Sequence, residues 1–193
     1  MSHRVCPWWL GYLLASPVRR LMCDPAKIIG PYVREGMTVL EPGPGMGFFT
    51  LELARRVGPS GRVVAVDSQP KMLRGLKRRA EKAGLLERVD ARLADSHSLG
   101  VADLGGAVDF ALVFAVVHEL PAAGTFFIEV AAALKPGAKL FFAEPKGHVN
   151  DLQFAAELKA ATKAGLALVD RPSIRRSHAA LLEKTSAPAV GLS

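Results

Sequence analysis

The chain alternates between short strand-like apolar runs and longer segments in which apolar residues recur every three or four positions. The strand-like runs occupy residues 37–40, 62–67, 88–95, 108–117 and 135–145, the last of which begins with a turn. Runs of this length suit strands, and strands that are apolar throughout rather than alternating are covered on both faces, as in a parallel sheet. The pattern therefore predicts a buried parallel sheet.

The segments between these runs have the spacing of helices that turn one apolar face inward. Ser68 stands where an N-cap is expected, just before Pro70 in the first turn of a helix. A further helix is expected around residues 152–163. The inward positions are Phe49, Leu53 and Val57 in the first helix, Met72, Leu76 and Ala80 in the second, and Phe126 or Phe127, Val130 and Leu134 in the third.

Two more strand-like runs, 167–172 and 179–186, close the chain. The connection between them is too short for a crossover, so they should form an antiparallel hairpin. The predicted fold is α/β: a Rossmann-like, doubly wound, seven-stranded sheet, mostly parallel, with an antiparallel C-terminal hairpin strand. Residues 1–36 precede this sheet and are expected to form an N-terminal helical cap on the same domain, which continues over 37–193.

Composition narrows the class of protein without naming a function. The 193 residues suit one domain, and 50% hydrophobic with 22% charged residues is ordinary globular usage. The longest apolar run, 110–117, is far shorter than the roughly 20 residues that span a bilayer. The first residues imitate a secretion signal, but Pro7, Gly11 and the Trp8-Trp9 pair fit a packed helical segment better. With only two cysteines, a reducing cytoplasm and no metal site are expected.

The formal charge of +7 raises the question of a polyanionic partner. Much of it falls in one predicted helix, in Arg74, Lys77, Arg78, Arg79 and Lys82, whose other face is apolar. Such a run is more often a solvated face than a contact surface. A nucleic-acid partner is therefore disfavoured, no membrane span is expected, and a homodimer stays open.

The stretch VLEPGPGMGFFT, residues 39–50, is the strongest candidate for a ligand loop. Its glycines, Gly43, Gly45 and Gly47, form a GxGxG, and Phe48 stands where a dinucleotide fingerprint needs its last glycine. Glu41 directly precedes the loop and would repel a diphosphate but attract an amine. Asp67 follows the last glycine by 20 residues, the separation that places an acid on a ribose. The ligand is expected to be a nucleoside that carries little phosphate and a positive charge.

Taken in order, these motifs resemble those of the class I S-adenosylmethionine-dependent methyltransferases. VLEPGPGMG is similar to their first motif, VVAVDSQPKML to the second, RLADSH to the third, and residues 114–145 to the stretch through strands four and five. The resemblance covers roughly residues 36–185. Within the family the chain resembles the small-molecule group that includes the ubiquinone and menaquinone C-methyltransferases. It implies S-adenosylmethionine as the cofactor of residues 37–193.

The resemblance implies a role for each matching residue. Glu41 would face the methionine amino group, and the three loop glycines would let the backbone approach the cofactor. Asp67, with Ser68 beside it, would accept the ribose hydroxyls, and Asp95, with Ser96 or His97 alongside, would take the adenine amino group. Phe114 and Ala115 would line the methionine arm, although Phe114 could equally be core packing.

The acceptor of the methyl group is less defined. A sulfonium methyl is already activated, so no general base is obligatory. His118 and Glu144 are weak candidates for catalytic residues, with His148 nearby, because residues in such places more often have a structural, capping or solvated role. Trp8, Trp9 and Tyr12 could close over a flat or apolar substrate.

Several alternative functions stay open. Cys6 and Cys23 suggest arsenite as an acceptor only weakly, because a third cysteine is missing. A nucleoside-binding module without turnover, an RNA methyltransferase and, less favoured, a nicotinamide oxidoreductase are the alternatives to an enzyme acting on a small aromatic or lipophilic molecule.

Overall fold

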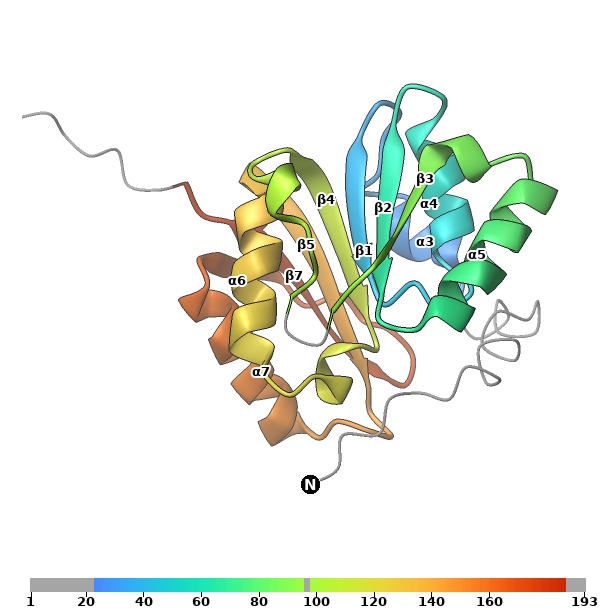
Figure 1. Cartoon of the computed structure of the whole chain (residues 1–193). Helices are drawn as coiled ribbons and strands as arrows, with labels where there is room; N and C mark the ends of the chain where they lie inside the picture. Colours follow the sequence, from blue (N-terminus) through green and yellow to red (C-terminus); the bar gives the residue numbers. More distant parts are fainter. Residues whose placement is uncertain (1–22, 96–97, 187–193) are drawn as a thin grey trace, which may run out of the picture.

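A computed structural model describes residues 23–95 and 98–186, and in this part of the chain seven strands form one sheet between two layers of helices (Figure 1). The order across the sheet is β3-β2-β1-β4-β5-β7-β6. The strands are β1 (Thr38–Pro42), β2 (Arg62–Asp67), β3 (Val89–Leu93), β4 (Val108–Phe114), β5 (Leu134–Pro145), β6 (Leu166–Asp170) and β7 (Ser177–Lys184). The α-helices are α3 (Pro25–Ile29), α4 (Thr50–Val57), α5 (Pro70–Lys82), α6 (Ala123–Ala133) and α7 (Asp151–Lys163), and the 3₁₀ turns are η1 (Leu86–Arg88), η2 (Ala102–Leu104) and η3 (Val117–Glu119).

The sheet confirms the predicted topology. β1 pairs in parallel with β2 and β4, β2 with β3, and β4 with β5. β7 runs antiparallel to both β5 and β6, so the last two strands form the expected hairpin. The chain starts in the middle of the sheet, moves outward to β3 and returns to β4 on the other side of β1. Ligands bind in such sheets where the strand order reverses, which here is the carboxyl edge between β1 and β4.

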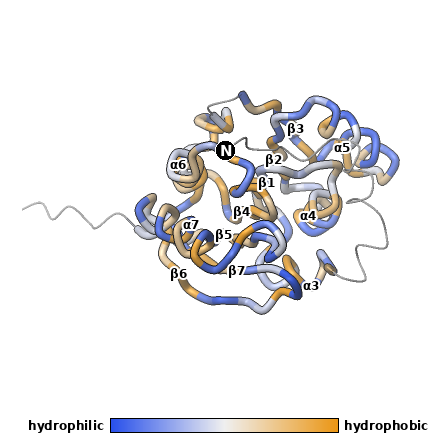
Figure 2. The backbone as a smooth tube through the Cα atoms, turned by 90° about the horizontal axis from the view of Figure 1, so that it is seen from below, coloured by the Kyte–Doolittle hydropathy of each residue, from blue (hydrophilic) through white to orange (hydrophobic). Residues whose placement is uncertain are grey.

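Both faces of the sheet are buried because neighbouring residues of the strands are apolar. In β1, Val39 packs into the cluster under α3 and α4, whereas Leu40 packs into the cluster under α6 and α7. Val63 and Val64 of β2 divide in the same way. In Figure 2 orange segments lie in the interior around β4, and blue is frequent along α5. The predicted inward positions of the helices are all buried, including both Phe126 and Phe127.

The fourth strand ends earlier than the sequence predicts. Residues 115–117 were expected to continue it, but β4 ends at Phe114 and the chain turns at Ala115, which has a φ of 61°. The following amides bond to the side chain of Glu144 in β5 instead of to a neighbouring strand. The prediction was wrong because these residues are apolar but lie in the turn that leads into η3.

The predicted N-cap of α5 was also wrong. The N-cap is Gln69, and its backbone N–H donates to Oδ1 of Asp67 at 2.8 Å. Pro70 does stand in the first turn, as expected. The acid at the end of β2 therefore holds the backbone of the residue at which the helix begins, and no side-chain hydrogen bond caps the first turn.

The predicted N-terminal cap is described only from residue 23. Ile28 and Ile29 of α3 are buried against the sheet, and Arg56 of α4 donates to the Ala26 carbonyl at 3.2 Å. Trp8, Trp9, Tyr12 and Cys6 lie outside the described residues. Over residues 23–95 and 98–186, no helix has the length and apolar composition needed to cross a bilayer.

Candidate active site

A cavity of about 510 Å³ opens at the carboxyl edge of the sheet, where the reversal of strand order predicts a ligand site. Its wall is formed by the ends of β1, β2 and β4, the loop after β3, η3 and α6. Much of this wall is apolar, with Phe48, Phe49 and Phe114 among its side chains. The ring centroids of Phe49 and Phe114 lie 4.7 Å apart, so Phe114 both lines the cavity and packs against a neighbouring ring.

Glu41 is the most unusual polar group of the cavity. Its residue is only 3% exposed, and its Oε2 is buried without a hydrogen-bond partner. Burial raises the pKa of Glu41 to about 8, and the nearby charge of Asp67 acts in the same direction. The Thr50 hydroxyl lies close enough to oppose this rise, although the two groups do not meet hydrogen-bond geometry. A buried carboxyl without a partner is costly and is suited to a cationic ligand.

The glycine loop and Asp67 are held together by hydrogen bonds. Oδ2 of Asp67 accepts the Gly45 N–H at 3.3 Å. Burial raises the pKa of Asp67 to about 6, and the charge of Glu119 adds to this rise. The hydrogen bonds from the Gln69 and Gly45 amides act in the opposite direction and lower the pKa. Arg79 of α5 donates to the Met46 carbonyl and so ties the helix to the loop.

The three loop glycines have different surroundings. Gly43 and Gly45 line the cavity, and a side chain on Gly45 would meet nothing within 4 Å. Gly47 does not line the cavity. A Cβ on Gly47 would lie 2.5 Å from Cδ1 of Leu76. Gly47 therefore lets α5 pack closely against the loop, whereas Gly45 leaves room for a ligand.

The loop after β3 forms another edge of the cavity. Asp95 lines it, and its Oδ1 accepts the Ser98 N–H at 2.6 Å. Glu129 of α6 accepts the Ser98 hydroxyl at 3.0 Å and the Leu99 N–H at 2.8 Å. Sequence reasoning missed Glu129, although its charge in the otherwise uncharged sequence AGTFFIEVAAA was a usable signal. Ser96 and His97 lie outside the described residues.

His118 and Glu144, the catalytic candidates, do not line the cavity. Glu144 is completely buried, and its Oε1 accepts the N–H groups of Val116 and Val117 at 3.2 and 2.7 Å. Its Oε2 lies 2.5 Å from Nδ1 of His118. Burial alone would lower the pKa of His118, but the hydrogen bond to Glu144 and the charges of nearby carboxylates raise it. This geometry favours a structural role for Glu144, which fixes η3. The rings of His118 and His148 lie 5.2 Å apart, and His148 is exposed.

The structure thus brings most of the predicted cofactor residues to one cavity: Glu41, Gly43, Gly45, Asp67, Ser68, Asp95, Phe114 and Ala115. Ala115 contributes through its left-handed backbone, and its N–H donates to the Ala143 carbonyl at 2.8 Å. Across residues 23–95 and 98–186 no group of three or more His, Cys, Asp or Glu side chains could hold a metal.

A family model described as a methyltransferase domain matches residues 33–180 of the chain. This range spans the whole sheet up to the middle of β7 and includes the entire cavity wall. The chain belongs to the family of class I S-adenosylmethionine-dependent methyltransferases. The resemblance read from the sequence motifs is confirmed.

Known relatives of this methyltransferase differ in the molecules they are named for. The chain is 31% identical over 159 residues to a ubiquinone biosynthesis O-methyltransferase of Methylocella silvestris, covering 79% of this chain and 58% of the relative. It is 30% identical over 138 residues to an arsenite methyltransferase of Halobacterium salinarum, covering 70% of this chain and 34% of the relative. The chain thus spans only about a third to three fifths of these relatives.

The fold of the methyltransferase also matches solved structures. A SAM-dependent methyltransferase from Aquifex aeolicus superposes with a TM-score of 0.83 at 24% identity, covering 94% of this chain and all of the other. At this identity the likeness supports the fold, including the seven-stranded mixed sheet.

The cavity fits the family's cofactor, S-adenosylmethionine. The orphaned carboxyl oxygen of Glu41 suits an ammonium group, and Asp67 keeps acceptor capacity for hydroxyls beyond its two amide bonds. The space beside Gly45 admits a ligand against the backbone. S-adenosylmethionine supplies a methyl group on a positively charged sulfur, which keeps the electron pair of the carbon–sulfur bond when the methyl leaves.

Proposed function

We propose that this chain transfers the methyl group of S-adenosylmethionine to a small, aromatic or lipophilic acceptor. The observation that carries the proposal is the buried carboxyl of Glu41, whose Oε2 has no hydrogen-bond partner, at a cavity that Asp67 also lines from the end of the neighbouring strand. A nicotinamide dinucleotide would bring a diphosphate towards Glu41, which disfavours it.

Three polar parts of the cofactor have a proposed partner in the chain. Glu41 binds the methionine ammonium, Asp67 the ribose hydroxyls, and Asp95 the adenine amino group, with Ser68 and Ala115 contributing to the same walls. Charge-assisted hydrogen bonds of this kind are each worth about 1.5–3 kcal/mol where water is excluded. Their main contribution to catalysis is to hold the methyl group in a fixed position relative to the acceptor.

The acceptor class is supported by the apolar part of the wall. Phe48, Phe49, Leu120 and Phe126 line the cavity together with Phe114. Flat or lipophilic molecules gain about 25 cal/mol for each Å² of apolar surface that such a wall removes from water.

Calorimetric titration with S-adenosylmethionine, S-adenosylhomocysteine and NADH tests the cofactor assignment. We expect micromolar binding of the first two and none of NADH. Glu41→Ala and Asp67→Ala should each weaken binding more than tenfold, whereas Glu87→Ala, which removes an exposed carboxylate at the amino edge of the sheet, should not. NADH binding, or unchanged affinity in both site variants, would refute the assignment.

Turnover is tested separately, by following methyl transfer from labelled S-adenosylmethionine to quinols, phenols and thiols. Methylation of any of these compounds supports an enzyme. Cofactor binding without transfer to any member of a broad panel would favour the nucleoside-binding module.

A further inference from the structure

The described residues of the cavity wall include acidic side chains but no basic ones. Five carboxylates line it, and no Lys, Arg or His is among the described residues of the wall. The whole chain nevertheless has a formal charge of +7, so the acidity is local to the cavity. The five carboxylates are Glu41, Asp67, Asp95, Glu119 and Glu129.

Four of these carboxylates already have a role. In the proposed function Glu41, Asp67 and Asp95 bind three polar parts of the cofactor: the ammonium group, the ribose hydroxyls and the adenine amino group. Glu129 accepts hydrogen bonds from the Ser98 hydroxyl and the Leu99 amide, so it fixes the loop after β3. The fifth carboxylate lies in a part of the wall to which we assign no group of the cofactor.

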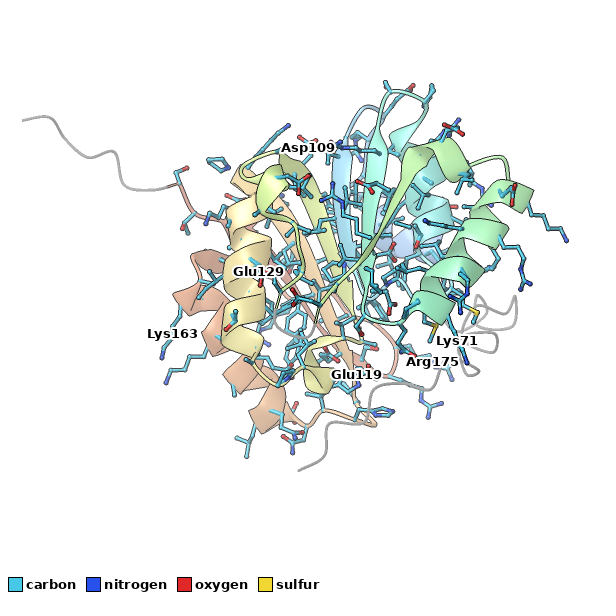
Figure 3. All side chains as sticks on the ribbon, viewed as in Figure 1. Lys71, Asp109, Glu119, Glu129, Lys163 and Arg175 are labelled. Atoms are coloured by element: carbon cyan, nitrogen blue, oxygen red, sulfur yellow. The ribbon has the colours of Figure 1, made fainter. Side chains whose placement is uncertain are left out.

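That carboxylate, Glu119, is the last residue of η3, and residues 120–122 after it also line the cavity. Figure 3 shows Glu119 at the lower edge of the sheet, where β4 leads into η3, and Glu129 on α6. The backbone of η3 is rigidly held, because Glu144 accepts the amides of Val116 and Val117. The position of Glu119 relative to β1 and β4 is therefore fixed by the fold.

Glu119 also acts electrostatically on its surroundings. Its charge contributes to the raised pKa of Asp67, which is the acid at the end of β2. On its other side, Oε1 lies 3.9 Å from Nε2 of His118. His118 is bonded through Nδ1 to Glu144, so a proton on Nε2 would face Glu119. A carboxylate between an acidic cavity and a histidine is well placed to receive a proton.

We propose that Glu119 is the acceptor-side carboxylate, and that the methyl acceptor presents an amino or hydroxyl group to it and carries no negative charge. The proposal rests on the proposed methyltransferase function. As the acceptor nitrogen or oxygen forms its bond to the methyl carbon, the carbon–sulfur bond breaks and its electron pair stays on the sulfur. The acceptor's bond to hydrogen breaks as well, and the proton passes to the Glu119 carboxylate. An acceptor that placed a carboxylate or phosphate at this position would instead meet repulsion from Glu119.

Two probes of similar size and opposite charge test the proposal, because they share a ring and differ in one group. Benzylamine and benzoate are titrated calorimetrically into the chain saturated with S-adenosylhomocysteine, which cannot donate a methyl group. We expect benzylamine to bind at least tenfold more tightly than benzoate. Glu119→Gln should reduce this preference to threefold or less and change the affinity for S-adenosylhomocysteine less than threefold. Glu87→Gln, which removes an exposed carboxylate at the amino edge of the sheet, should leave the preference unchanged.

The outcomes separate this proposal from the proposed function. If S-adenosylhomocysteine itself does not bind, the methyltransferase assignment fails. If it binds but benzoate binds as tightly as benzylamine, or neither probe binds, or Glu119→Gln keeps the preference, Glu119 is not the acceptor-side group. A tenfold loss of S-adenosylhomocysteine affinity in Glu119→Gln would place Glu119 in the cofactor site and would also overturn the proposal.

Discussion

Binding of the cofactor should release a proton from Glu41. Burial raises the pKa of this carboxyl to about 8 in the free chain, so at pH 7 about 90% of the molecules carry the proton there. An ammonium group is bound best by the ionised carboxylate, and its charge lowers the pKa of its partner below the usual value. Binding at pH 7 should therefore release about 0.9 protons from Glu41 into the buffer.

The same linkage predicts how affinity changes with pH. Because the bound state has lost the proton, raising the pH towards 8 favours binding. For a pKa of about 8, the affinity should increase about 20-fold between pH 6.0 and 7.5. Asp67, whose pKa burial raises to about 6, should add roughly a further factor of two. Above this range the cofactor's own ammonium begins to lose its charge, and the gain should level off.

Calorimetry in buffers of different ionisation enthalpy measures the released protons directly. S-adenosylhomocysteine serves as the ligand because it carries the same amino group and cannot react. Glu41→Gln is the matched control: it keeps the shape and buries no charge, so its proton release should fall below about 0.2 and its affinity should vary only weakly with pH. Release that stays near zero in the wild type, or is equal in both proteins, would refute the placement of the ammonium on Glu41.

Further predictions concern stability and the loops. The pKa of Glu41 is raised in the folded chain, so the folded state binds its proton more tightly than the unfolded state. The free energy of unfolding should therefore fall as pH rises from about 5 to 8. In thermal melts over that range, the melting temperature of Glu41→Gln should rise relative to that of the wild type. Glu129→Gln should weaken S-adenosylhomocysteine binding about tenfold in calorimetry with little change in melting temperature, because it loosens the loop after β3. Gly47→Ala should lower the free energy of unfolding by about 1–3 kcal/mol in urea titrations, since its φ is 84° and the new Cβ would lie 2.5 Å from Leu76 Cδ1. Gly45→Ala, which meets no atom, should cost only about 1 kcal/mol of stability but weaken cofactor binding more than tenfold.

The order and pairing of the strands could be predicted from the sequence because the signals for strands and helices are local. Buried parallel strands are apolar throughout, and each helix turns a periodic apolar face towards them. The end of β4 could not be predicted in this way. Ala115 and the next two residues are apolar like the strand, and what ends it is the carboxylate of Glu144, which bonds to Val116 from 28 residues further along the chain. A long-range hydrogen bond leaves no trace in the local pattern.

The candidate site was predictable in part for a related reason. Acids at strand ends and a glycine loop indicate a ligand edge, and Glu41, Asp67 and Asp95 do meet at one cavity. The side chains that sequence reasoning missed, Glu119 and Glu129, reach the cavity from η3 and α6, and their contribution depends on how those elements pack rather than on strand order.

Two buried glutamates differ in whether their carboxyl oxygens have hydrogen-bond partners within the chain. Glu41 and Glu144 are both almost inaccessible to water, and both stand near the carboxyl ends of central strands. Glu144 accepts two backbone amides and lies on His118, so its charge is compensated within the chain. Glu41 has an oxygen without any partner, and the chain bears that cost in the free state. A cationic ligand would supply the missing partner, so the unsatisfied oxygen, together with its place at the cavity, supports our proposal that Glu41 binds the ammonium group.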